Sequence, residues 1–483
     1  AGIAADAAGR GLTVLLAEKG DLGGATSSAS SKLIHGGLRY LEHYEFRLVR
    51  HALIEREVLL ANAPHIVHPL RFVLPHAAGQ RPRWMIRTAL FLYDHLARRR
   101  LIPGSRAVNL SRDPAGAALR PDLRHGFAYW DCRVDDARLT VLNACAAAGR
   151  GAEILTRTEA RHARVDGDHW LVRLDRGGQE RTVAGRILVN AAGPWVGHFG
   201  QAIQANADGA QPAQVRLVKG SHVVVARIAG LDAAVLLQAA DGRVVFLLPF
   251  EEHFTLIGTT ERAFSGDPAT AAISDEERDY LLGVANGYLR RPLTAGDIAW
   301  SFAGVRPLYD DQSSNPSAVT RDYRLEFAAW PSHPPLLTVL GGKITTYRRL
   351  AEDALAVLAP HLPGMGPAWT ASAPLPGGDL GGRSFEAFLA DLKRRKQGFS
   401  AEFLERLARR HGSLVEEVIG GARSQADLGT PLGAGLTEAE VHYLARREWA
   451  RTADDVLWRR TKCGLHLGPS ARRQVEQRIT ALI

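Results

Sequence analysis

The segment from Thr26 to Tyr40 is the most informative stretch of this 483-residue sequence. It contains hydroxyl side chains, bases and a glycine pair, at Thr26, Ser27, Ser28, Ser30, Ser31, Lys32, His35, Gly36, Gly37, Arg39 and Tyr40. Hydroxyl and backbone N–H groups bind phosphates, and adjacent glycines let a backbone approach a flat ring. A serine-rich stretch alone usually indicates a loop. This one ends in His-Gly-Gly and Arg-Tyr, which a solvated loop does not need, so it indicates a ligand site.

The first eighteen residues predict part of a nucleotide-binding unit. Residues 1–12 carry small side chains at helical spacing, residues 13–17 form a short apolar run, and Glu18 follows. A small-residue helix, a buried strand and a terminal acid make the second half of a dinucleotide-binding βαβ unit. The acid then bonds the adenosine ribose hydroxyls, and a surface glutamate after a strand is the alternative for Glu18.

Three later strings could supply cations for a phosphate. They are residues 304–308 (GVRPL), 320–323 (TRDY) and 341–348 (GGKITTYR), the last of which follows the apolar run 336–340. A strand, a glycine pair and a helix start direct N–H groups at a ligand. Each string alone is a weak signal, but together with Arg39 they predict a pocket of cations.

The remaining pattern predicts the elements that position these groups. Residues 42–64 are apolar at helical spacing, and residues 153–190 form a β excursion that runs into Ala191, Gly193 and Trp195. Residues 207–330 indicate a mainly antiparallel sheet domain. Residues 360–382 are rich in Pro and Gly and predict a linker, after which helical spacing indicates an all-α domain.

Composition excludes several classes of protein. Hydrophobic residues make up 46% and charged residues 23%, which is typical of globular chains. The three cysteines form no C-x-x-C pair, so we expect no metal site. The net charge of +9 raises the alternative of a non-catalytic nucleic-acid- or membrane-binding protein, but no basic stripe with interleaved aromatics is present, and we expect no nucleic-acid partner.

Residues 83–100 combine apolar side chains with flanking arginines. Such a helix can lie on an anionic membrane, or it can be buried with a basic end that its dipole favours. For this segment alone the buried alternative is slightly preferred. The basic end of the C-terminal region, Arg446 to Lys462, is interpreted as a solvated face.

Residues 1–75, with the string ATSSASSKLIHGGLRYLE, closely resemble the FAD-dependent glycerol-3-phosphate dehydrogenases of aerobic bacteria. The similarity runs along the whole chain, and glycerophosphate oxidases are the nearest alternative. The resemblance implies an α/β fold: a doubly wound, Rossmann-like FAD-binding domain (1–75, 130–206 and 300–358) interleaved with a mainly antiparallel substrate domain (76–129 and 207–299), a linker (359–382) and a helical domain (383–483). The family's G-x-G-x-x-G ends just before the position matching Ala1, so we expect the first strand and glycine loop to be missing, with an inactive fragment as a further alternative.

The resemblance also implies residue roles. For FAD they are Glu18, Thr26, Ser27, Ser28, Ser30, Ser31, Lys32, Leu33, His35, Gly36, Gly37, Ala191, Gly193, Trp195, Gly341, Gly342, Lys343, Ile344 and Thr345. For substrate they are Arg39, Tyr40, Thr259, Arg306, Arg321 and Lys343, and the catalytic group is His35, His222, Arg306 and Lys343. The family usually has Asp at position 261, where this chain has Glu, which weakens any role carried over to that position.

The implied reaction is oxidation of sn-glycerol 3-phosphate to dihydroxyacetone phosphate. His35 is the first choice for the base that removes the hydroxyl proton and His222 the second, while the alternative is that His35 only hydrogen-bonds the flavin. The implied acceptor is a membrane quinone, or oxygen if the chain is an oxidase. The family further implies peripheral association with the cytoplasmic face of the bacterial inner membrane, with the cytoplasm as the alternative location, and a homodimer is possible. An NAD-linked dehydrogenase is the rival within the same class, but nicotinamide folds do not need the His-Gly-Gly loop.

Overall fold

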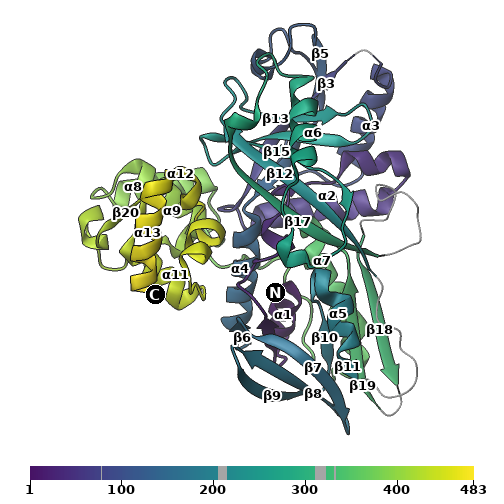
Figure 1. The fold of residues 1–483 in the computed structure, drawn as a ribbon, viewed down its shortest axis with the longest axis vertical. Helices are drawn as coiled ribbons and strands as arrows, with labels where there is room; N and C mark the ends of the chain where they lie inside the picture. The colour runs from purple at the N-terminus through teal and green to yellow at the C-terminus, as the bar shows by residue number, and fades with distance from the viewer. Residues whose placement is uncertain (78, 205–214, 310–321, 331–332) are drawn as a thin grey trace.

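The computed structural model describes residues 1–77, 79–204, 215–309, 322–330 and 333–483. Figure 1 shows a mixed α/β body with a helical domain at one side. Two parallel strand pairs form the lower part of the body. β1 (Leu15–Glu18) pairs with β6 (Glu153–Thr156), and β10 (Leu188–Asn190) pairs with β19 (His333–Leu340), which also pairs antiparallel with β18 (Arg324–Trp330).

The small side chains of α1 (Gly2–Gly9) let it pack between two other helices. Ala4, Ala5 and Ala8 share a core with α4 (Asp136–Ala148), and Ala7 shares one with α7 (Tyr347–Leu358). Because the buried apolar side chains of α1 are all alanines, both neighbours approach its backbone closely. The predicted small-residue helix and the strand that follows it are therefore confirmed, although the strand is half-buried and not buried as predicted.

The predicted β excursion is confirmed as a separate four-stranded sheet with the order β11-β7-β8-β9. Its strands are β7 (Glu159–Asp166), β8 (His169–Arg176), β9 (Gln179–Gly185) and β11 (Ile203–Gln204). Gly167, Gly177 and Gly178 occupy the two hairpin turns with positive φ, a conformation that glycine adopts without a steric cost.

A ten-stranded sheet forms the upper part of the body, with eight strands in the order β16-β12-β15-β14-β13-β3-β5-β2 and with β17 on β12 and β4 on β5. The strands are β2 (Leu33–Ile34), β3 (Val67–His76), β4 (Arg106–Asn109), β5 (His125–Val134), β12 (Val215–Ala226), β13 (Ala234–Gln238), β14 (Val244–Phe250), β15 (Phe254–Gly258), β16 (Arg262–Ala263) and β17 (Ile298–Tyr309). Most of these pairings are antiparallel, as expected for the substrate domain.

The expected domain boundaries need correction at this sheet. Residues 67–75, 130–134 and 300–309 were assigned to the FAD-binding domain, yet they belong to β3, β5 and β17 of the large sheet. The hydrophobic pattern of a strand shows that it is buried but not which neighbour it pairs with, and backbone hydrogen bonds decide that.

Alternate side chains of the large sheet build two cores. Phe72, Val224 and Leu256 face α3 (Arg83–His95) on one side, while Val73, Val223 and Ile257 face α6 (Asp275–Asn286) on the other. This period of two is what a sheet covered on both faces requires. The predicted helix over 42–64 is confirmed as α2 (Phe46–Asn62), which lies beside the first core.

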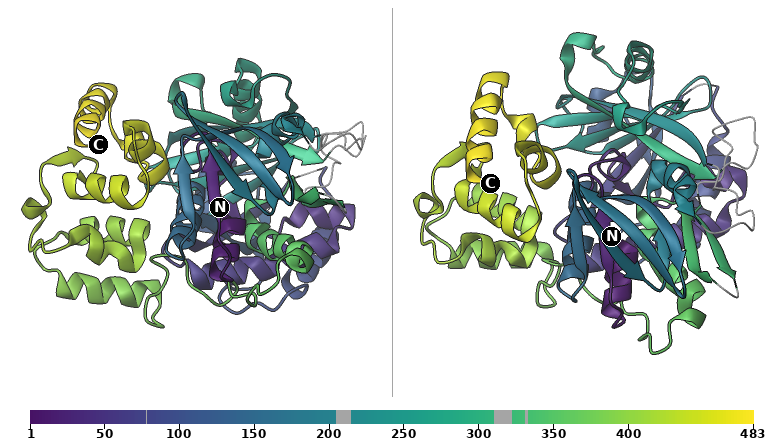
Figure 2. Two further views of the ribbon diagram at one scale, coloured as in Figure 1. Left: turned by 90° about the horizontal axis from the view of Figure 1, so that it is seen from below. Right: turned by 60° about the horizontal axis from the view of Figure 1, so that its bottom comes forward.

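Residues 383–483 form the predicted helical domain, which Figure 2 shows as a cluster apart from the sheets. Its helices are α8 (Phe385–Arg395), α9 (Ala401–His411), α10 (Val415–Ile419), α11 (Glu438–Arg447), α12 (Cys463–His466) and α13 (Pro469–Leu482), with a π-helix η11 (Asp455–Arg460). A short hairpin, β20 (Pro431–Gly433) and β21 (Leu436–Thr437), departs from the all-α expectation. Ser384, Ser400 and Thr437 cap α8, α9 and α11 by accepting backbone N–H groups.

The basic C-terminal segment is only in part the solvated face that its composition suggested: Arg446, Arg447 and Arg451 are exposed, but Arg460 and Lys462 are buried. Arg460 is fully buried and donates to Asp21 at 2.6 and 2.8 Å, and Lys462 donates to the N-cap residue of α4, Asp135, at 3.1 Å. Buried guanidinium and ammonium groups need carboxylate partners, and here the partners come from the α/β body. We call this contact between the two parts the domain seam; its ion pairs are Arg460–Asp21, Lys462–Asp135, Arg157–Asp455 and Arg138–Glu448.

No helix in the described part of the chain is long and apolar enough to span a bilayer.

Candidate functional site

A cavity of about 390 Å³ lies where the parallel strands, the large sheet and α1 meet. It is lined by Ala1, Gly2, Thr26, Ser27, Ala29, Ser30, Ser31, Leu33, His35, Tyr40, Leu139, Thr140, Asn143, Gly304, Arg306, Pro307, Leu308, Gly341, Gly342, Lys343, Ile344, Thr345, Tyr347 and Leu350. Segments that are hundreds of residues apart therefore share one cavity, as the scattered strings predicted.

The hydroxyl-rich loop, residues 26–32, is held by hydrogen bonds to the large sheet and to α4. Thr26 Oγ1 donates to the carbonyl of Val305 on β17 at 2.6 Å. The backbone N–H of Ser30 and its Oγ donate to Asp136 Oδ2, at the start of α4, at 3.2 and 2.8 Å. These bonds leave the cavity-facing side of the loop available to a ligand.

Lys32 has a structural position rather than a place in the cavity wall. Its buried Nζ lies 2.9 and 3.0 Å from the Asp136 carboxylate and 2.8 Å from the Ser28 carbonyl oxygen. A buried cation with a carboxylate partner is compensated and has little charge to offer a ligand. Lys32 thus anchors the loop, and neither it nor Ser28 lines the cavity.

The His35–Gly36 turn rests on a buried polar network. The Gly36 N–H donates to Tyr93 Oη at 2.8 Å, Tyr93 Oη donates to Asp131 at 2.7 and 2.8 Å, and Arg56 Nη1 donates to Asp131 at 2.6 Å. A β-carbon at Gly36 would lie 2.6 Å from Tyr93 Oη and from Leu53 Cδ2, so only glycine fits without displacement. The network fixes the backbone that carries His35.

His35 faces the cavity as a neutral imidazole. Burial, together with the charges of Lys343 and Arg56, lowers the pKa of its ring to about 3. Its backbone N–H donates to Thr345 Oγ1 at 3.3 Å, which joins the two strings of the site. A neutral ring keeps a lone pair that can accept a hydrogen bond or a proton.

Lys343 lies opposite, at the start of η7 (Ile344–Thr346). Its Nζ lies 3.5 Å from the centre of the Tyr40 ring, and a β-carbon at Gly37 would lie 3.5 Å from that nitrogen. Gly341 and Gly342 precede it with φ of 69° and 98°, which turns the chain from β19 into the cavity wall.

Arg306 reaches the cavity from β17. Its Nη1 lies 3.8 Å from Oε1 of Glu261, the residue at which this chain departs from the family pattern. Thr259 lies next to this arginine, since a β-carbon at Gly220 would meet both Thr259 Oγ1 and Arg306 Nη2. Thr259 itself does not line the cavity.

Several expected site residues lie away from the cavity wall. Glu18 ends β1 as predicted and accepts the Gly20 N–H at 2.8 Å, and burial raises the pKa of its carboxyl. Trp195 lies under Lys19 Nζ at 3.5 Å and donates to Asp267 at 3.3 Å. Arg39 follows Leu38 in η2 (Leu38–His43). None of these three, nor Ala191, Gly193, Gly36 or Gly37, lines the cavity, and Arg321 lies outside the described residues. Their assigned roles stay predictions.

His222 lies behind the wall. It is fully buried on β12, and its Nε2 is 2.9 Å from Oγ of Ser31, which does line the cavity. Among the described residues the Ser31 hydroxyl is the one hydrogen-bond partner of the His222 ring, so it links His222 to the cavity.

Sequence reasoning missed the contribution of α4 and α7. Leu139, Thr140 and Asn143 of α4 line the cavity together with Tyr347 of α7. The Asn143 side chain donates to the Leu139 carbonyl at 2.8 Å and also bonds Tyr347. No motif marks the three residues of α4, and Tyr347 was indicated only as a member of the string 341–348. Gly304 belongs to a string that the sequence did single out, and a β-carbon there would lie 2.7 Å from Ala29 Cβ.

Comparison with known proteins places this arrangement in a class. The family model described as FAD dependent oxidoreductase matches residues 1–348, and that of the C-terminal domain of alpha-glycerophosphate oxidase matches residues 368–482. The chain therefore belongs to the FAD-dependent oxidoreductases.

Individual relatives narrow the class. A glycerol-3-phosphate dehydrogenase of Pseudomonas aeruginosa is 53% identical over 99% of this chain and 92% of its own length. A D-erythritol 1-phosphate dehydrogenase of Brucella abortus is 48% identical over 98% of this chain and 94% of its own. The crystal structure of a glycerol-3-phosphate dehydrogenase from Bacillus halodurans complexed with FAD superposes with a TM-score of 0.78 at 28% identity, covering 100% of this chain and 88% of that one. The chain belongs to this family of polyol-phosphate dehydrogenases.

The cavity fits the cofactor of the family. Ala1 and Gly2 at the start of α1 line it, and the first amides of a helix favour an anion such as a pyrophosphate. The ring of Tyr40 lines the cavity, and a β-carbon at Gly37 would lie 2.2 Å from it, so only glycine fits beside that ring. FAD is the cofactor of this protein, and the residues that would hold it are those of the hydroxyl-rich loop, the glycine pair 341–342 and η7.

Proposed function

We propose that this protein oxidises sn-glycerol 3-phosphate to dihydroxyacetone phosphate. The observation that carries the proposal is one cavity that brings together two cations, Arg306 and Lys343, and one neutral imidazole, His35. Among the described residues, the lining set contains no carboxylate, so the cavity attracts an anion. The names of the most similar relatives support a phosphorylated polyol as that anion.

Different residues of the chain bind the substrate, accept its proton and stabilise the developing charge. Arg306 and Lys343 bind and orient the phosphate and the carbinol oxygen, and a guanidinium can bond two phosphate oxygens at once. FAD, when bound, takes up the hydride from C2 of the substrate. His35 accepts the hydroxyl proton, so that the two electrons and both hydrogens of the carbinol are accounted for. Lys343, as a fixed cation, stabilises negative charge that develops beside it.

His35 is supported over His222 as the base because His35 lines the cavity and His222 does not. The pKa of His222 is also held well below its usual range, by burial and by Arg306 and Lys32. Both rings are neutral at pH 7, but only His35 can contact a substrate hydroxyl directly.

The assay that tests the proposal uses the full-length flavoprotein with two substrates and two acceptors. Glycerol 3-phosphate and D-erythritol 1-phosphate are compared, each with a soluble quinone analogue and with oxygen. We expect the larger kcat/KM for glycerol 3-phosphate with the quinone analogue. A preference for the four-carbon substrate, or equal rates with oxygen alone, would contradict the corresponding part of the proposal.

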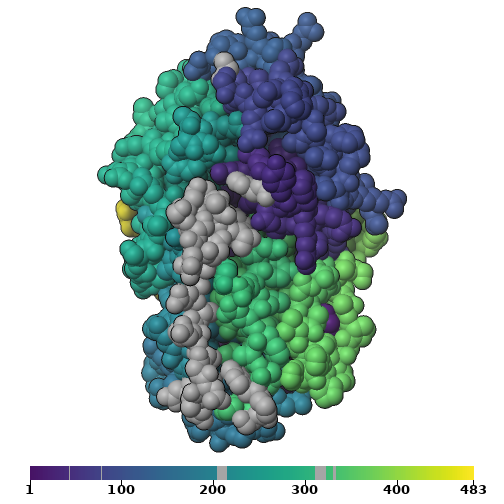
Figure 3. Space-filling model, turned by 90° about the vertical axis from the view of Figure 1, so that its right-hand side faces the viewer, coloured from purple at the N-terminus to yellow at the C-terminus, as the bar shows by residue number. Residues whose placement is uncertain are grey.

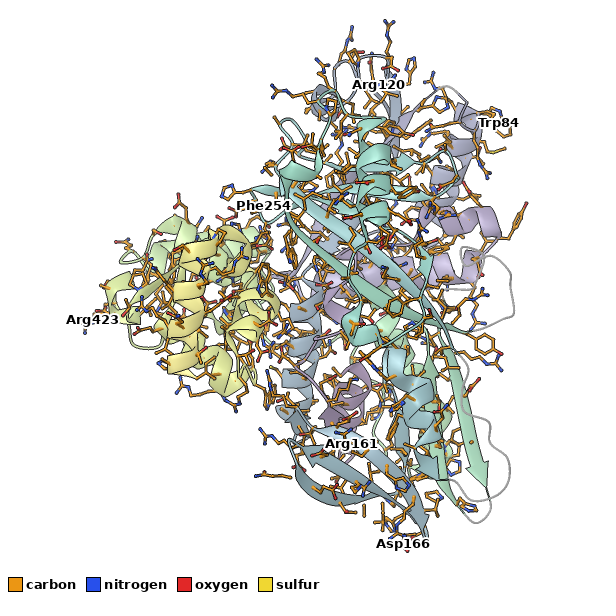
Figure 4. All side chains as sticks on the ribbon, viewed as in Figure 1. Trp84, Arg120, Arg161, Asp166, Phe254 and Arg423 are labelled. Carbon is orange, nitrogen blue, oxygen red and sulfur yellow. The ribbon has the colours of Figure 1, made fainter. Side chains whose placement is uncertain are left out.

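We further propose that electrons leave at the cytoplasmic face of a bacterial membrane, to a quinone. Support comes from α3, whose outer face exposes Trp84, Met85, Phe91 and Leu92 while Ile86, Leu90 and Tyr93 face the core. Exposed arginines at 83 and 87 flank this α3 patch. Figure 4 shows Trp84 pointing away from the body, and Figure 3 shows the α3 segment (dark blue) beside the segment of η2 and α2 (purple) on one face. Aromatic side chains with basic neighbours suit an anionic bilayer surface.

Sedimentation with vesicles tests the membrane contact. Trp84→Ser should reduce binding to vesicles that contain anionic lipid by about ten- to a hundredfold, since about 1.5–3 kcal/mol accompanies burial of a large apolar side chain. Phe327→Ser, which removes an exposed aromatic side chain from β18, is the matched control and should bind as the wild type does. Equal loss in both variants, or in neither, would refute a specific α3 contact. The homodimer stays a prediction.

A further inference from the structure

Ser31 and His222 form a pair that spans the cavity wall. Ser31 Oγ lies 2.9 Å from His222 Nε2, and Ser31 lines the cavity while the histidine is fully buried. The imidazole stacks on Phe302, with ring centres 4.8 Å apart and planes 14° apart. A β-carbon at Gly258 would lie 2.1 Å from its Cδ2, so a glycine there makes room for the ring. The ring is held from both sides and cannot turn freely.

The imidazole of His222 carries one N–H group. Burial and the charges of Arg306 and Lys32 keep the ring neutral, so one nitrogen is protonated and the other is bare. The direction of the Ser31 hydrogen bond depends on which nitrogen carries the proton.

The surroundings of Nδ1 indicate which ring nitrogen of His222 carries the proton. Among the described residues Nδ1 has no hydrogen-bond partner, and it is buried. Orphaned buried N–H groups are rarer in proteins than acceptors with an unused lone pair. The favoured tautomer therefore leaves Nδ1 bare and puts the hydrogen on Nε2, which donates to Ser31 Oγ.

A hydroxyl that accepts from a histidine still has its own hydrogen to donate. In the described part of the chain Ser31 Oγ makes no second hydrogen bond, and the cavity lies on its open side. We propose that His222 is a positioning residue that makes Ser31 a hydrogen-bond donor into the cavity, toward an acceptor atom on the bound ligand. The proposal rests on the proposed function, and the acceptor is either a flavin ring atom or an oxygen of the phosphorylated polyol.

The tautomer can be measured on the FAD-loaded, full-length protein without any assay of turnover. In ¹⁵N spectra of protein labelled only at histidine, protonated and bare ring nitrogens resonate far apart, and the His222→Gln variant identifies the signals of His222. We expect a protonated Nε2 and a bare Nδ1. A protonated Nδ1 would overturn the proposal, because Ser31 would then donate to the histidine instead.

A double-mutant cycle tests the consequence for the ligand. Ser31→Ala and His222→Leu should each weaken ligand binding about tenfold, and the double variant should be no weaker than either one. His222→Gln, whose side-chain amide keeps an N–H donor, should stay within about threefold of the wild type. Thermal unfolding identifies variants that fail to fold, and in that case the Gln variant alone decides. Additive losses, or equal losses for Leu and Gln, would overturn the proposal.

The FAD dissociation constant and the KM together show whether the acceptor atom belongs to the flavin or to the substrate. If the flavin is the acceptor, the FAD dissociation constant rises and KM does not; if the substrate is, KM for glycerol 3-phosphate rises at unchanged FAD affinity. A protein that binds FAD but oxidises neither polyol phosphate would refute the proposed function, while the tautomer and the FAD affinities would still test the Ser31–His222 pair.

Discussion

The cavity and the domain seam use buried charge in opposite ways. In the cavity wall the cations Arg306 and Lys343 face a hollow, and the described lining residues include no carboxylate. At the seam each cation lies against an acid: Arg460 on Asp21, Arg157 on Asp455 at 2.6 Å, Lys462 on Asp135, and Arg138 on Glu448. Arg306 also has an acid nearby, Glu261 at 3.8 Å, so the difference lies in whether a cation additionally faces a hollow that an anion can enter.

This difference distinguishes charged residues that bind a ligand from charged residues that stabilise the fold. A compensated buried pair contributes to the assembled structure mainly because either partner alone would be costly. A cluster of like charge costs stability but attracts an anion, and its energy is recovered when the anion binds. We therefore expect substitutions at the seam to alter unfolding, and substitutions in the cavity to alter turnover.

The largest effect is expected at the seam. Arg138→Met leaves Glu448 without its closest partner in a fully buried position, and should lower the free energy of unfolding by about 3–5 kcal/mol. Denaturant unfolding measures the loss. Arg395→Met, at an exposed ion pair with Glu416, is the matched control and should cost less than about 1 kcal/mol. Equal losses would remove the distinction between buried and exposed pairs.

The next effect is expected in the cavity. His35→Asn removes the proton acceptor and should lower kcat about a thousandfold, with KM and thermal stability little changed. Steady-state kinetics across pH checks this expectation. Unchanged kcat at every pH would show that His35 only hydrogen-bonds the flavin.

Lys343→Met should lower kcat/KM about a hundredfold, because it removes a cation that the substrate phosphate and the developing charge both need. The unfolding midpoint should stay within a few degrees of the wild type. Lys393→Met, at an exposed pair with Glu405 in α8, is the control and should not affect kinetics. A loss of stability in place of activity would assign Lys343 to the architecture instead.

The smallest effect concerns His65, which is fully buried beside the seam. Burial, Arg138 and His411 lower the pKa of its ring to about 3, while the unfolded ring titrates near 6.5. Between pH 6.5 and 3 the unfolded chain binds the extra proton, so stability falls as pH falls. His65→Leu should reduce this slope by at most about 1.4 kcal/mol per pH unit. Denaturant unfolding at pH 7 and pH 5 measures it, and parallel curves for both proteins would contradict the assignment.

Local pattern was enough to predict the elements of the site. The string 26–40, the strand before Gly341 and the helix of small residues all appear where the sequence indicated them, because period and glycine content report local conformation. The sequence also predicted one pocket for Arg39, Arg306, Arg321 and Lys343; Arg306 and Lys343 do share the cavity, Arg39 does not line it, and Arg321 lies outside the described residues. It did not predict that Lys32 turns away to Asp136, because the partner is 104 residues distant and carries no motif.

The same limit explains the other corrections. Strands β3 and β17 joined the large sheet, and the basic segment that ends at Lys462 became part of a seam, through partners far away in the chain. Asn143 entered the cavity wall only because α4 packs beside α1. Burial pattern shows that a residue has neighbours, and the identity of those neighbours depends on long-range packing.

The amino-acid sequence by itself determined which chemistry this protein can perform, since hydroxyls, glycines, an imidazole and cations are properties of residue types and their spacing. Only the tertiary structure decided which charges form ion pairs with one another and which face the ligand. The reason is physical: the effect of a buried charge depends on the distance to its counter-charge, and that distance is set by the fold.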